Sequence, residues 1–485
     1  MGRRTRIHHP PALLWALMTF LLLPGCISVG PDYVRPETPV PQTWHTGMDG
    51  GLEAAQPDPA RLALWWENLE DPVLTDLMER AVNNNLDLKQ AVSRVREARS
   101  QLSIAMAGLF PSLDATGSVT RRSGSENTGS GQSRTLYSAG LDAGWELDLF
   151  GGVRRSVEAA DADLQATRED LHDVLVSLTA ETGLNYFDLR TYQARLAVAE
   201  ANLKNQDESY KMTRERYEAG LTDELDVQKA RANLESSRSR IPSLRSGLEG
   251  SMNRLAVLLG VQPGTLHREM DQASPIPVVP ASVAVGVPAD VLRQRPDIRK
   301  AERELAAQTA RVGAATAELY PKLTLNGSIG LEALNSGELF SSGARAGSYG
   351  PRISWPVFQA GAIRQNIEVQ SARQEQALLG YESTVLGALE EVENTLTAYA
   401  GEQRRRDALS DAADAAGQAY GYARIKYEAG LTDFSDLLDA QRSLLVLQDE
   451  LATSNGTVTA NLVRLYKALG GGWEPLAGTG GVNQE

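Results

Sequence analysis

Two different periods of hydrophobic and polar residues alternate along this chain of 485 residues. Apolar residues recur at helical spacing through several long stretches, which predicts amphipathic helices. In two other stretches apolar and polar residues alternate one by one on either side of a Gly/Ser-rich tip, which predicts a β-hairpin in each. The predicted helices occupy 72–108, 154–219, 225–259, 364–429 and 437–469, and the predicted hairpins occupy 111–147 and 321–357.

The whole pattern is written twice, with a constant offset of 210 residues. Residues 109–111 are similar to residues 319–321, and the heptapeptide 217–223 is repeated at 427–433. A fixed offset that includes turns, strands and helix ends indicates two copies of one structural unit, and each copy is expected to leave a face for the other to cover. The function is therefore sought in a pseudo-symmetric assembly before a single catalytic cleft.

The predicted organisation follows from the two copies. It comprises a signal peptide at 1–25, an extended, proline-rich N-terminal tether at 26–70, a first repeat at 71–260 with its hairpin at 111–147, a linker at 261–288, a second repeat at 289–470 with its hairpin at 321–357, and a C-terminal tail at 471–485.

The helices at 154–219 and 364–429 are unusually long. The first contains no proline and only one glycine, Gly183. At 1.5 Å per residue it would extend roughly 100 Å. A period of seven runs through both helices, although Arg406 interrupts the second, and such a period predicts a left-handed coiled coil. The expected seam consists of Leu175, Thr182, Leu189, Leu196, Leu203, Tyr210 and Tyr217, and of Val385, Val392, Tyr399, Ala413, Tyr420 and Tyr427 in the second copy.

The first residues have the composition of a leader. A basic start precedes the apolar run 12–23, which is too short for a comfortable transmembrane helix. The tetrapeptide that ends at Cys26 resembles a bacterial lipobox, and Cys26 is the only cysteine of the chain. We expect a lipid on Cys26. The alternative is a free thiol in an ordinary signal peptide. Ile27 in place of aspartate favours the outer membrane, by resemblance to lipoproteins.

Charge and motifs exclude several classes of function. The net charge is −14 and there is no basic run, which disfavours nucleic-acid binding. His45, His172 and His267 are scattered along the mature chain without partners at metal-ligand spacing. No phosphate loop, CxxC motif or nucleophile elbow is present. We therefore expect neither an enzyme nor a cofactor or metal.

The strands and long helices together predict a membrane assembly. Four strands cannot close a barrel alone, but three chains would supply twelve, which is within the bacterial range. A lipid and the strands would hold one end in a membrane, and the helices would project from it through an aqueous space. The alternative is a soluble pair of hairpins packed on helices.

Two segments carry a resemblance to a known family. Residues 26–33 and the string 292–299, which Ala301 and Glu302 follow, resemble the TolC-like outer-membrane efflux factors of the NodT-type lipoprotein branch. The resemblance covers nearly the whole mature chain. It implies an internally duplicated α+β membrane protein that forms a homotrimer, in which a twelve-stranded β-barrel in the outer membrane continues into a periplasmic α-barrel closed at its tip. It also implies partners, namely a periplasmic adaptor and an inner-membrane pump of the resistance-nodulation-division type.

Two carboxylates after the second helical tip are the sharpest candidate site. Asp436 and Asp439 are three residues apart and therefore share one helix face. Repeated by trimer symmetry, they would form an acidic ring, which attracts cations and raises carboxylate pKa values. The alternative is that acids decorate a helix N-terminus. The resemblance implies a paired-aspartate gate here. The first copy has Asp226 and Lys229 at these positions, so the second copy would build most of the ring.

Two further tip residues bear on the gate. The hydroxyl of Tyr427 is expected to help hold the closed state, although its place in the heptad seam equally suits plain packing. In the resembling family an arginine often links this tip, whereas this chain has Thr432. The closing network is therefore expected to differ.

The two helical tips are expected to contact the adaptor. The same residues also suit a tight turn, because glycine favours a helix C-terminus and Thr or Asp favours the next N-terminus. The expected contact residues are Gly220, Leu221, Thr222, Gly430, Leu431 and Thr432.

The function expected from these features is passive export. The chain would be the outer-membrane channel of a tripartite efflux pump and would pass small molecules such as drugs and toxic compounds from the periplasm to the exterior. Two alternatives remain. One is the outer-membrane duct of a type I protein secretion system, and the other is a lipid-anchored coiled-coil structural protein.

Overall fold

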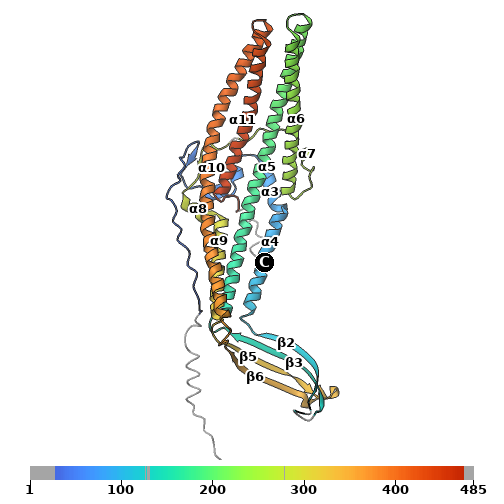
Figure 1. Ribbon diagram of the computed structural model, residues 1–485, viewed down its shortest axis with the longest axis vertical. Coiled ribbons are helices and arrows are strands. Elements are labelled where there is room, and N and C mark those ends of the chain that lie inside the picture. Colours follow the sequence, from blue (N-terminus) through green and yellow to red (C-terminus); the bar gives the residue numbers. More distant parts are fainter. Residues whose placement is uncertain (1–27, 126, 128–130, 278, 474–485) are drawn as a thin grey trace, which may run out of the picture. The chain divides into compact units, whose positions relative to one another are not determined.

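Long helices and one curved sheet make up most of the chain in this computed structural model (Figure 1), which describes residues 28–125, 127, 131–277 and 279–473. The chain divides into two compact units. The strand unit consists of Met1–Arg35, Ala98–Leu164 and Glu304–Leu378. The hairpin unit consists of Pro36–Glu97, Gln165–Arg303 and Leu379–Glu485. Each unit takes segments from both sequence copies.

The strand unit holds a four-stranded antiparallel sheet. Its strands β2 (Ser112–Ser123), β3 (Ser133–Leu147), β5 (Lys322–Ala333) and β6 (Arg345–Ser354) lie in the order β2-β3-β5-β6. Both hairpins predicted from the alternation are therefore present, and β3 pairs with β5 to join the two copies.

The two faces of this sheet differ in chemistry. On one face hydroxyl and carboxylate groups bond across the strands, as Thr116 Oγ1 does to Asp142 Oδ2 at 2.8 Å. The other face carries large apolar side chains, including Val119, Ile329 and Ile353, which are all exposed. Within β2, β3, β5 and β6, none of the described residues is buried. The alternative of a soluble hairpin pair packed on helices is therefore wrong, because no helix covers the apolar face of the described sheet.

The helices repeat as closely as the strands. Helices α5 (Gly152–Glu218) and α10 (Ala362–Glu428) have 67 residues each, and the return helices α6 (Glu224–Leu258) and α11 (Phe434–Ala468) have 35 each. Helix α11 begins three residues before the predicted start, because Phe434 packs into the core. Within the described ranges, no helix combines the length and the apolarity that crossing a bilayer requires.

Shorter elements connect these helices. Asn85 separates α3 (Pro72–Asn84) from α4 (Leu86–Ala107), and its Oδ1 accepts the backbone N–H of Leu88 at 3.0 Å, as expected of a cap. The remaining elements are β1 (Leu52–Glu53), α2 (Pro59–Ala63), η1 (Trp65–Leu69), α7 (His267–Met270), β4 (Val283–Ala284), α8 (Pro288–Gln294), α9 (Pro296–Ala317), η2 (Ser336–Glu338) and η3 (Ser342–Ala344).

The tether predicted at 26–70 is only partly extended. Its residues 36–46 form no helix or strand and belong to the hairpin unit, whereas Pro59–Ala63 and Trp65–Leu69 form α2 and η1, so the prediction of an extended chain is wrong there. The indole N–H of Trp44 donates to the carbonyl of Gly286 at 3.0 Å. The carboxylate of Glu393 accepts the backbone N–H of His45 at 2.7 Å and the hydroxyl of Thr46 at 2.6 Å. Burial acts to raise the pKa of Glu393, but these hydrogen bonds outweigh it and hold the pKa below its usual value. The tether is thus fastened as part of the fold.

The predicted heptad seam is buried at five of its six positions in α10, where Tyr420 is half-buried, but it is wrong in the second half of α5. Leu175, Thr182 and Leu189 are buried as expected, whereas Leu203 and Tyr210 are only half-buried. The buried positions there belong to a different row of the helix. That row consists of Ala199, Asn202, Gln206, Ser209 and Thr213.

Candidate functional site

Both helical hairpins end in the same turn. Gly220 has φ +73° and Gly430 has φ +72°, a left-handed conformation that favours glycine. The next residue of each turn donates its N–H five residues back, from Leu221 to Arg216 and from Leu431 to Lys426, both at 2.8 Å. This is the Schellman arrangement, which satisfies the last carbonyls of a helix. The glycines alone therefore explain the turns, and the leucines need another reason.

The threonines of the tips bond to their own helices. Thr222 Oγ1 donates to Asp226 Oδ2 at 2.7 Å, and Thr432 Oγ1 donates to Asp436 Oδ2 in the same way. Thr432 therefore occupies the place of the expected arginine as a local partner of Asp436. Among the described residues it forms no cross-link of the kind an arginine would make.

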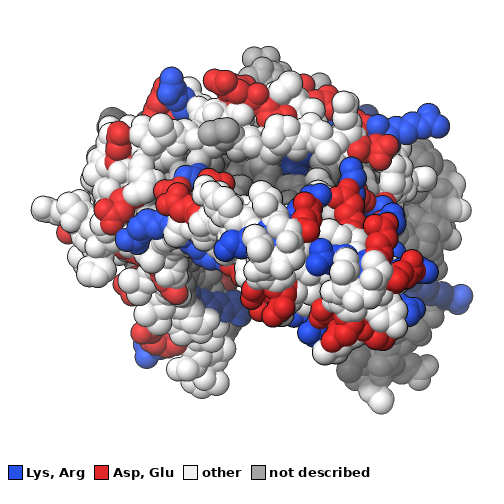
Figure 2. All heavy atoms as spheres, turned by 90° about the horizontal axis from the view of Figure 1, so that it is seen from above, with Lys and Arg blue, Asp and Glu red and all other residues white. Residues whose placement is uncertain are grey.

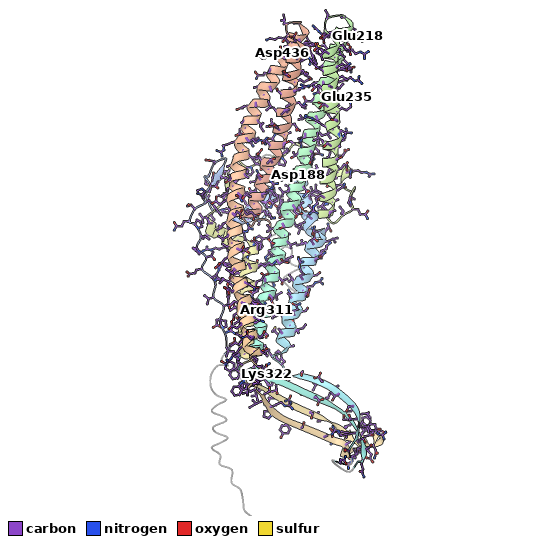
Figure 3. The ribbon with its side chains drawn as sticks, in the orientation of Figure 1. Asp188, Glu218, Glu235, Arg311, Lys322 and Asp436 are labelled. Atoms are coloured by element: carbon purple, nitrogen blue, oxygen red, sulfur yellow. The ribbon has the colours of Figure 1, made fainter. Side chains whose placement is uncertain are left out.

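The acidic pair lies on the outward face of α11 (Figure 3 labels Asp436). Asp436 and Asp439 are exposed, whereas Leu437 and Leu438 between them are buried. In the first copy, Lys229 Nζ lies 3.4 Å from Asp226 Oδ1 and neutralises it. Over the described residues, Asp436 and Asp439 form no such ion pair. The two copies thus present tips of different charge.

Tyr427 is buried where the two hairpins meet. Its side chain is 3% exposed and packs edge-on against Phe434 at 5.6 Å between ring centroids. Ala230 of the first copy belongs to the same cluster. The Tyr427 hydroxyl reaches Thr213 Oγ1 at 3.5 Å, which is a long contact. Within one chain, Tyr427 therefore serves packing between α5 and α10, and its expected role in closing remains a prediction.

Arg216 is a tip residue that the sequence reasoning missed. Its guanidinium lies 4.8 Å from the ring centroid of Tyr427, and Nη1 donates to the carbonyls of Tyr427 at 3.1 Å and Glu428 at 3.4 Å. A cation of the first hairpin thus binds both the ring and the C-terminal carbonyls of the second. A comparison of the two sequence copies could have pointed to Arg216, because the corresponding residue of the second copy is Lys426.

Below the tips a polar seam joins the hairpins. We use this name for Asn202, Gln206, Ser209 and Thr213 of α5. Asn202 Nδ2 donates to Gln448 Oε1 at 3.1 Å, and Gln441 Nε2 donates to Ser209 Oγ at 3.3 Å. Gln206 is 1% exposed, yet neither atom of its amide has a partner among the described residues. Such an interface is held less tightly than one packed with aliphatic side chains, because hydrogen bonds contribute little net stability and an unpaired amide detracts from it.

The surface of the tips combines charge with two apolar side chains. Leu221 is 66% exposed and Leu431 is 77% exposed. The view in Figure 2 shows acidic and basic side chains interspersed on this face. In the part of the chain that the structure describes, no three His, Cys, Asp or Glu side chains are placed to hold a metal ion. Cys26 lies outside the described residues.

A family profile matches both copies. The profile described as "Outer membrane efflux protein" covers residues 77–261 and again 287–471. The two matches begin 210 residues apart, as the two sequence copies do.

Relatives and a solved structure agree with this match. Nodulation protein T of Rhizobium leguminosarum bv. trifolii is 34% identical over 95% of this chain and 97% of its own length. The toluene efflux pump outer membrane protein TtgI of Pseudomonas putida is 34% identical over 94% of this chain and 97% of its own length. The structure of the outer-membrane channel OprN is 37% identical and covers 92% of this chain and 100% of its own, with a TM-score of 0.87.

The chain therefore belongs to the outer membrane efflux protein family, whose members are ducts without enzymatic activity. It is an outer-membrane channel component of an efflux pump. The resemblance to TolC-like factors is confirmed, and so is the expected chain fold of four strands and long, duplicated helices.

Replacing Arg216 tests how the second hairpin is held. We expect Arg216→Gln to lower the free energy of local opening at the C-terminus of α10 by about 1–2 kcal/mol, because the cation–π contact and two carbonyl contacts are lost. Hydrogen–deuterium exchange of residues 424–434 measures this. Arg214→Gln is the matched control, since Arg214 forms an ion pair with Glu218 on the exposed face of its own helix. Equal exchange in the two variants would contradict the assigned role.

Proposed function

We propose that this outer membrane efflux protein is a passive duct that carries small molecules from the periplasm to the exterior, and that it is gated at the tips of its helical hairpins. The observation that carries the proposal is the pair Asp436 and Asp439. It is exposed and without ion pairs among the described residues, on a hairpin that the first copy holds through Arg216 and the polar seam. An unneutralised acidic face on a weakly held element suits a gate.

Three copies of the chain would form the duct. The outer edges of β2 and β6 pair with no other described strand, and backbone groups left unpaired in a bilayer are costly. Twelve strands from a homotrimer would pair every edge and turn the apolar face toward lipid and the polar face toward the lumen. The same symmetry would place three Asp436–Asp439 pairs around the entrance.

The closed entrance would be an acidic ring. Six carboxylates crowded around one axis would attract cations. The counterpart in the first copy, Asp226, would contribute less because Lys229 neutralises it. Opening would then consist of moving the second hairpin away from the axis along the polar seam.

The tips would also receive a periplasmic adaptor, which links the duct to an inner-membrane pump. Leu221 and Leu431 expose large apolar side chains at turns that glycine already explains, and such exposure is typical of a contact surface. The glycines and threonines of the tips shape the turns and hold them in place. The leucines are therefore the binding side chains of the proposed surface.

Small molecules are the preferred cargo. The relative TtgI is named for toluene efflux, and its sequence matches nearly the whole chain. A duct for secreted proteins would share this architecture, so the partner decides between the two. The proposal of a coiled-coil structural protein has no support in the comparisons.

Removing the acidic pair tests the gate. For Asp436→Ala combined with Asp439→Ala, we expect a severalfold rise in resting single-channel conductance in planar bilayers. Block by divalent cations should weaken at least about tenfold, which corresponds to roughly 1.4 kcal/mol of lost cation binding. Asp226→Ala should change both quantities much less, because Lys229 already neutralises that carboxylate. A double variant with wild-type conductance and wild-type block would remove the pair from the gate.

Replacing an exposed apolar leucine by a charged residue tests the adaptor surface. Leu431→Glu should reduce adaptor crosslinking in intact cells at least about tenfold, since a charge would be placed in a desolvated contact. The protein should still assemble, because the Leu431 side chain is 77% exposed. Leu225→Glu, on an exposed position of the first return helix, serves as the comparison. Crosslinking that persists at the wild-type level in Leu431→Glu would place the adaptor elsewhere.

Cys26 is the proposed lipid attachment site, and labelling with a radioactive fatty acid tests it. Cys26→Ser should abolish incorporation into the purified protein, because no other cysteine is available. Ser28→Ala, two residues further along, should be labelled normally. Label that remains on Cys26→Ser would show that the acyl chain is attached elsewhere.

A further inference from the structure

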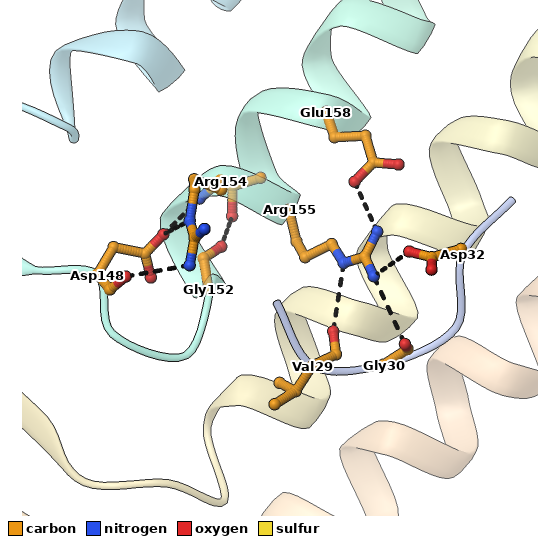
Figure 4. Close-up of polar contacts among 9 residues, drawn as sticks. Val29, Gly30, Asp32, Asp148, Gly152, Arg154, Arg155 and Glu158 are labelled. Carbon is orange, nitrogen blue, oxygen red and sulfur yellow. Dashed lines mark hydrogen bonds and ion pairs between the residues drawn. The ribbon is translucent and has the colours of Figure 1, made fainter. Parts of the chain in front are cut away.

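The first described residues of the chain lie against a small site within the strand unit (Figure 4). We call this site the cradle, and it consists of Phe150, Gly151, Arg155 and Gly313. The backbone N–H of Val29 donates to the carbonyl of Phe150 at 3.1 Å, just before α5 begins. Arg155, in the first turn of α5, donates from Nε to the carbonyl of Val29 at 3.2 Å and from Nη2 to Asp32 Oδ1 at 2.6 Å. A weaker contact reaches the carbonyl of Gly30 at 3.5 Å. One guanidinium thus holds an extended segment at three points.

Glycine forms the walls of this cradle. Gly30 has φ +92°, and a β-carbon on it would lie 2.4 Å from the Cα of Gly313 in α9. A β-carbon on Gly313 would in turn lie 2.9 Å from the side chain of Arg155. Gly151, with φ +81°, approaches Ser28 in the same way. The segment and its host are therefore fitted at backbone distance, and a larger residue in place of Gly30, Gly151 or Gly313 would force them apart.

Burial makes the contact strong. The side chain of Arg155 is only 5% exposed, although Asp32 remains largely in solvent. Apart from the segment, its remaining anionic partner is Glu158, at 2.8 Å. If the segment left, Arg155 would lose three acceptors, and its guanidinium would keep only Glu158 and solvent. The position of the segment therefore depends on Arg155.

In the second copy, the corresponding turn before α10 has no segment bound to it among the described residues. Gly361 is the counterpart of Gly151 and has φ +88°, yet no described atom lies within 4 Å of a β-carbon placed there. Gln365 replaces Arg155 and is exposed. The turn itself thus forms without a bound segment. Arg155 and the close fit are additions that belong to the first copy alone.

We propose that this cradle is a docking site for the chain's own N-terminal segment, Ser28–Asp32, and that it seats the membrane anchor beside the sheet. Cys26 is two residues from Ser28, so the chain can carry it no more than about 7 Å away. An acyl group there would enter the membrane at a fixed height relative to β3. This consequence rests on the proposed lipidation of Cys26, whereas the docking itself does not.

A nitroxide at residue 28 tests the docking in the full-length protein reconstituted in nanodiscs. Ser28 is exposed, and Ser28→Cys gives a reactive thiol beside an acylated Cys26. We expect an immobilised spectrum in this background. Arg155→Met and Gly30→Ala should each convert most of the signal to a mobile component. Arg311→Met is the matched control, because Arg311 pairs with Asp163 in the same unit and makes no described contact with the segment. Its spectrum should remain immobilised.

Each outcome decides the question. A mobile label in the Ser28→Cys background, or an immobilised one in Gly30→Ala, would overturn the proposal, and Gly30→Ala decides if Arg155→Met does not fold. A Cys26→Ser variant that is exported with an ordinary secretory leader distinguishes docking by the cradle from anchoring by the lipid. Docking should persist there, with an immobilised label and no acylation. A label that becomes mobile only when the lipid is lost would show that the membrane, and not the cradle, holds the segment.

Discussion

The unpaired edges of one small sheet are the constraint on which the rest of the architecture depends. The strand order β2-β3-β5-β6 leaves backbone donors and acceptors free along β2 and β6, and large apolar side chains face outward from the same strands. A large exposed apolar face is unfavourable in water, and free edges are not tolerated in lipid. Lipid would cover the apolar face and pairing with further strands would satisfy the edges, and further copies of the same chain are the simplest source of such strands. The duplication, with helical hairpins of equal length, would make such an assembly nearly uniform around its axis.

Function in such a uniform scaffold comes from positions where the copies differ. Arg216, Lys229 and Arg155 stand where the other copy carries lysine, aspartate and glutamine. Each difference changes a side-chain contact, while the two copies keep the same secondary structure at these positions. Arg216 binds the second hairpin, Lys229 neutralises the first acidic tip, and Arg155 holds the N-terminal segment. The fold is thus set by what the copies share, and the proposed gate and anchor by what they do not.

Much of the fold was accessible from the sequence because its signals are local or repeated. Alternation predicts β2 and β3 without knowledge of their neighbours, and the constant offset supports the same assignment in the second copy. The polar seam was not accessible, because counting apolar residues favours the row through Leu203 and Tyr210, whereas the buried row contains Gln206. Likewise, the acidic pair was visible as a spacing of three. The contacts of Arg216 with Tyr427 and of Arg155 with Asp32 were not, since in each pair the two residues lie more than a hundred positions apart.

The weakness of the contact between the hairpins is what makes gating physically reasonable. A buried leucine contributes roughly 1.5–3 kcal/mol, whereas a hydrogen bond contributes about 0.5–1.5 kcal/mol net. Replacing an aliphatic seam by one through Asn202 and Ser209, with the Gln206 amide unpaired, therefore lowers the cost of separating α5 from α11. The lower part of the same hairpins retains an apolar core around Leu175 and Leu189. Separation would thus begin along the polar seam and would also have to disrupt the smaller apolar cluster of Tyr427, Phe434 and Ala230 at the tip. An adaptor with a few kcal/mol of preference for the open form would shift the population. A uniformly apolar seam would require far more than one docking partner can supply.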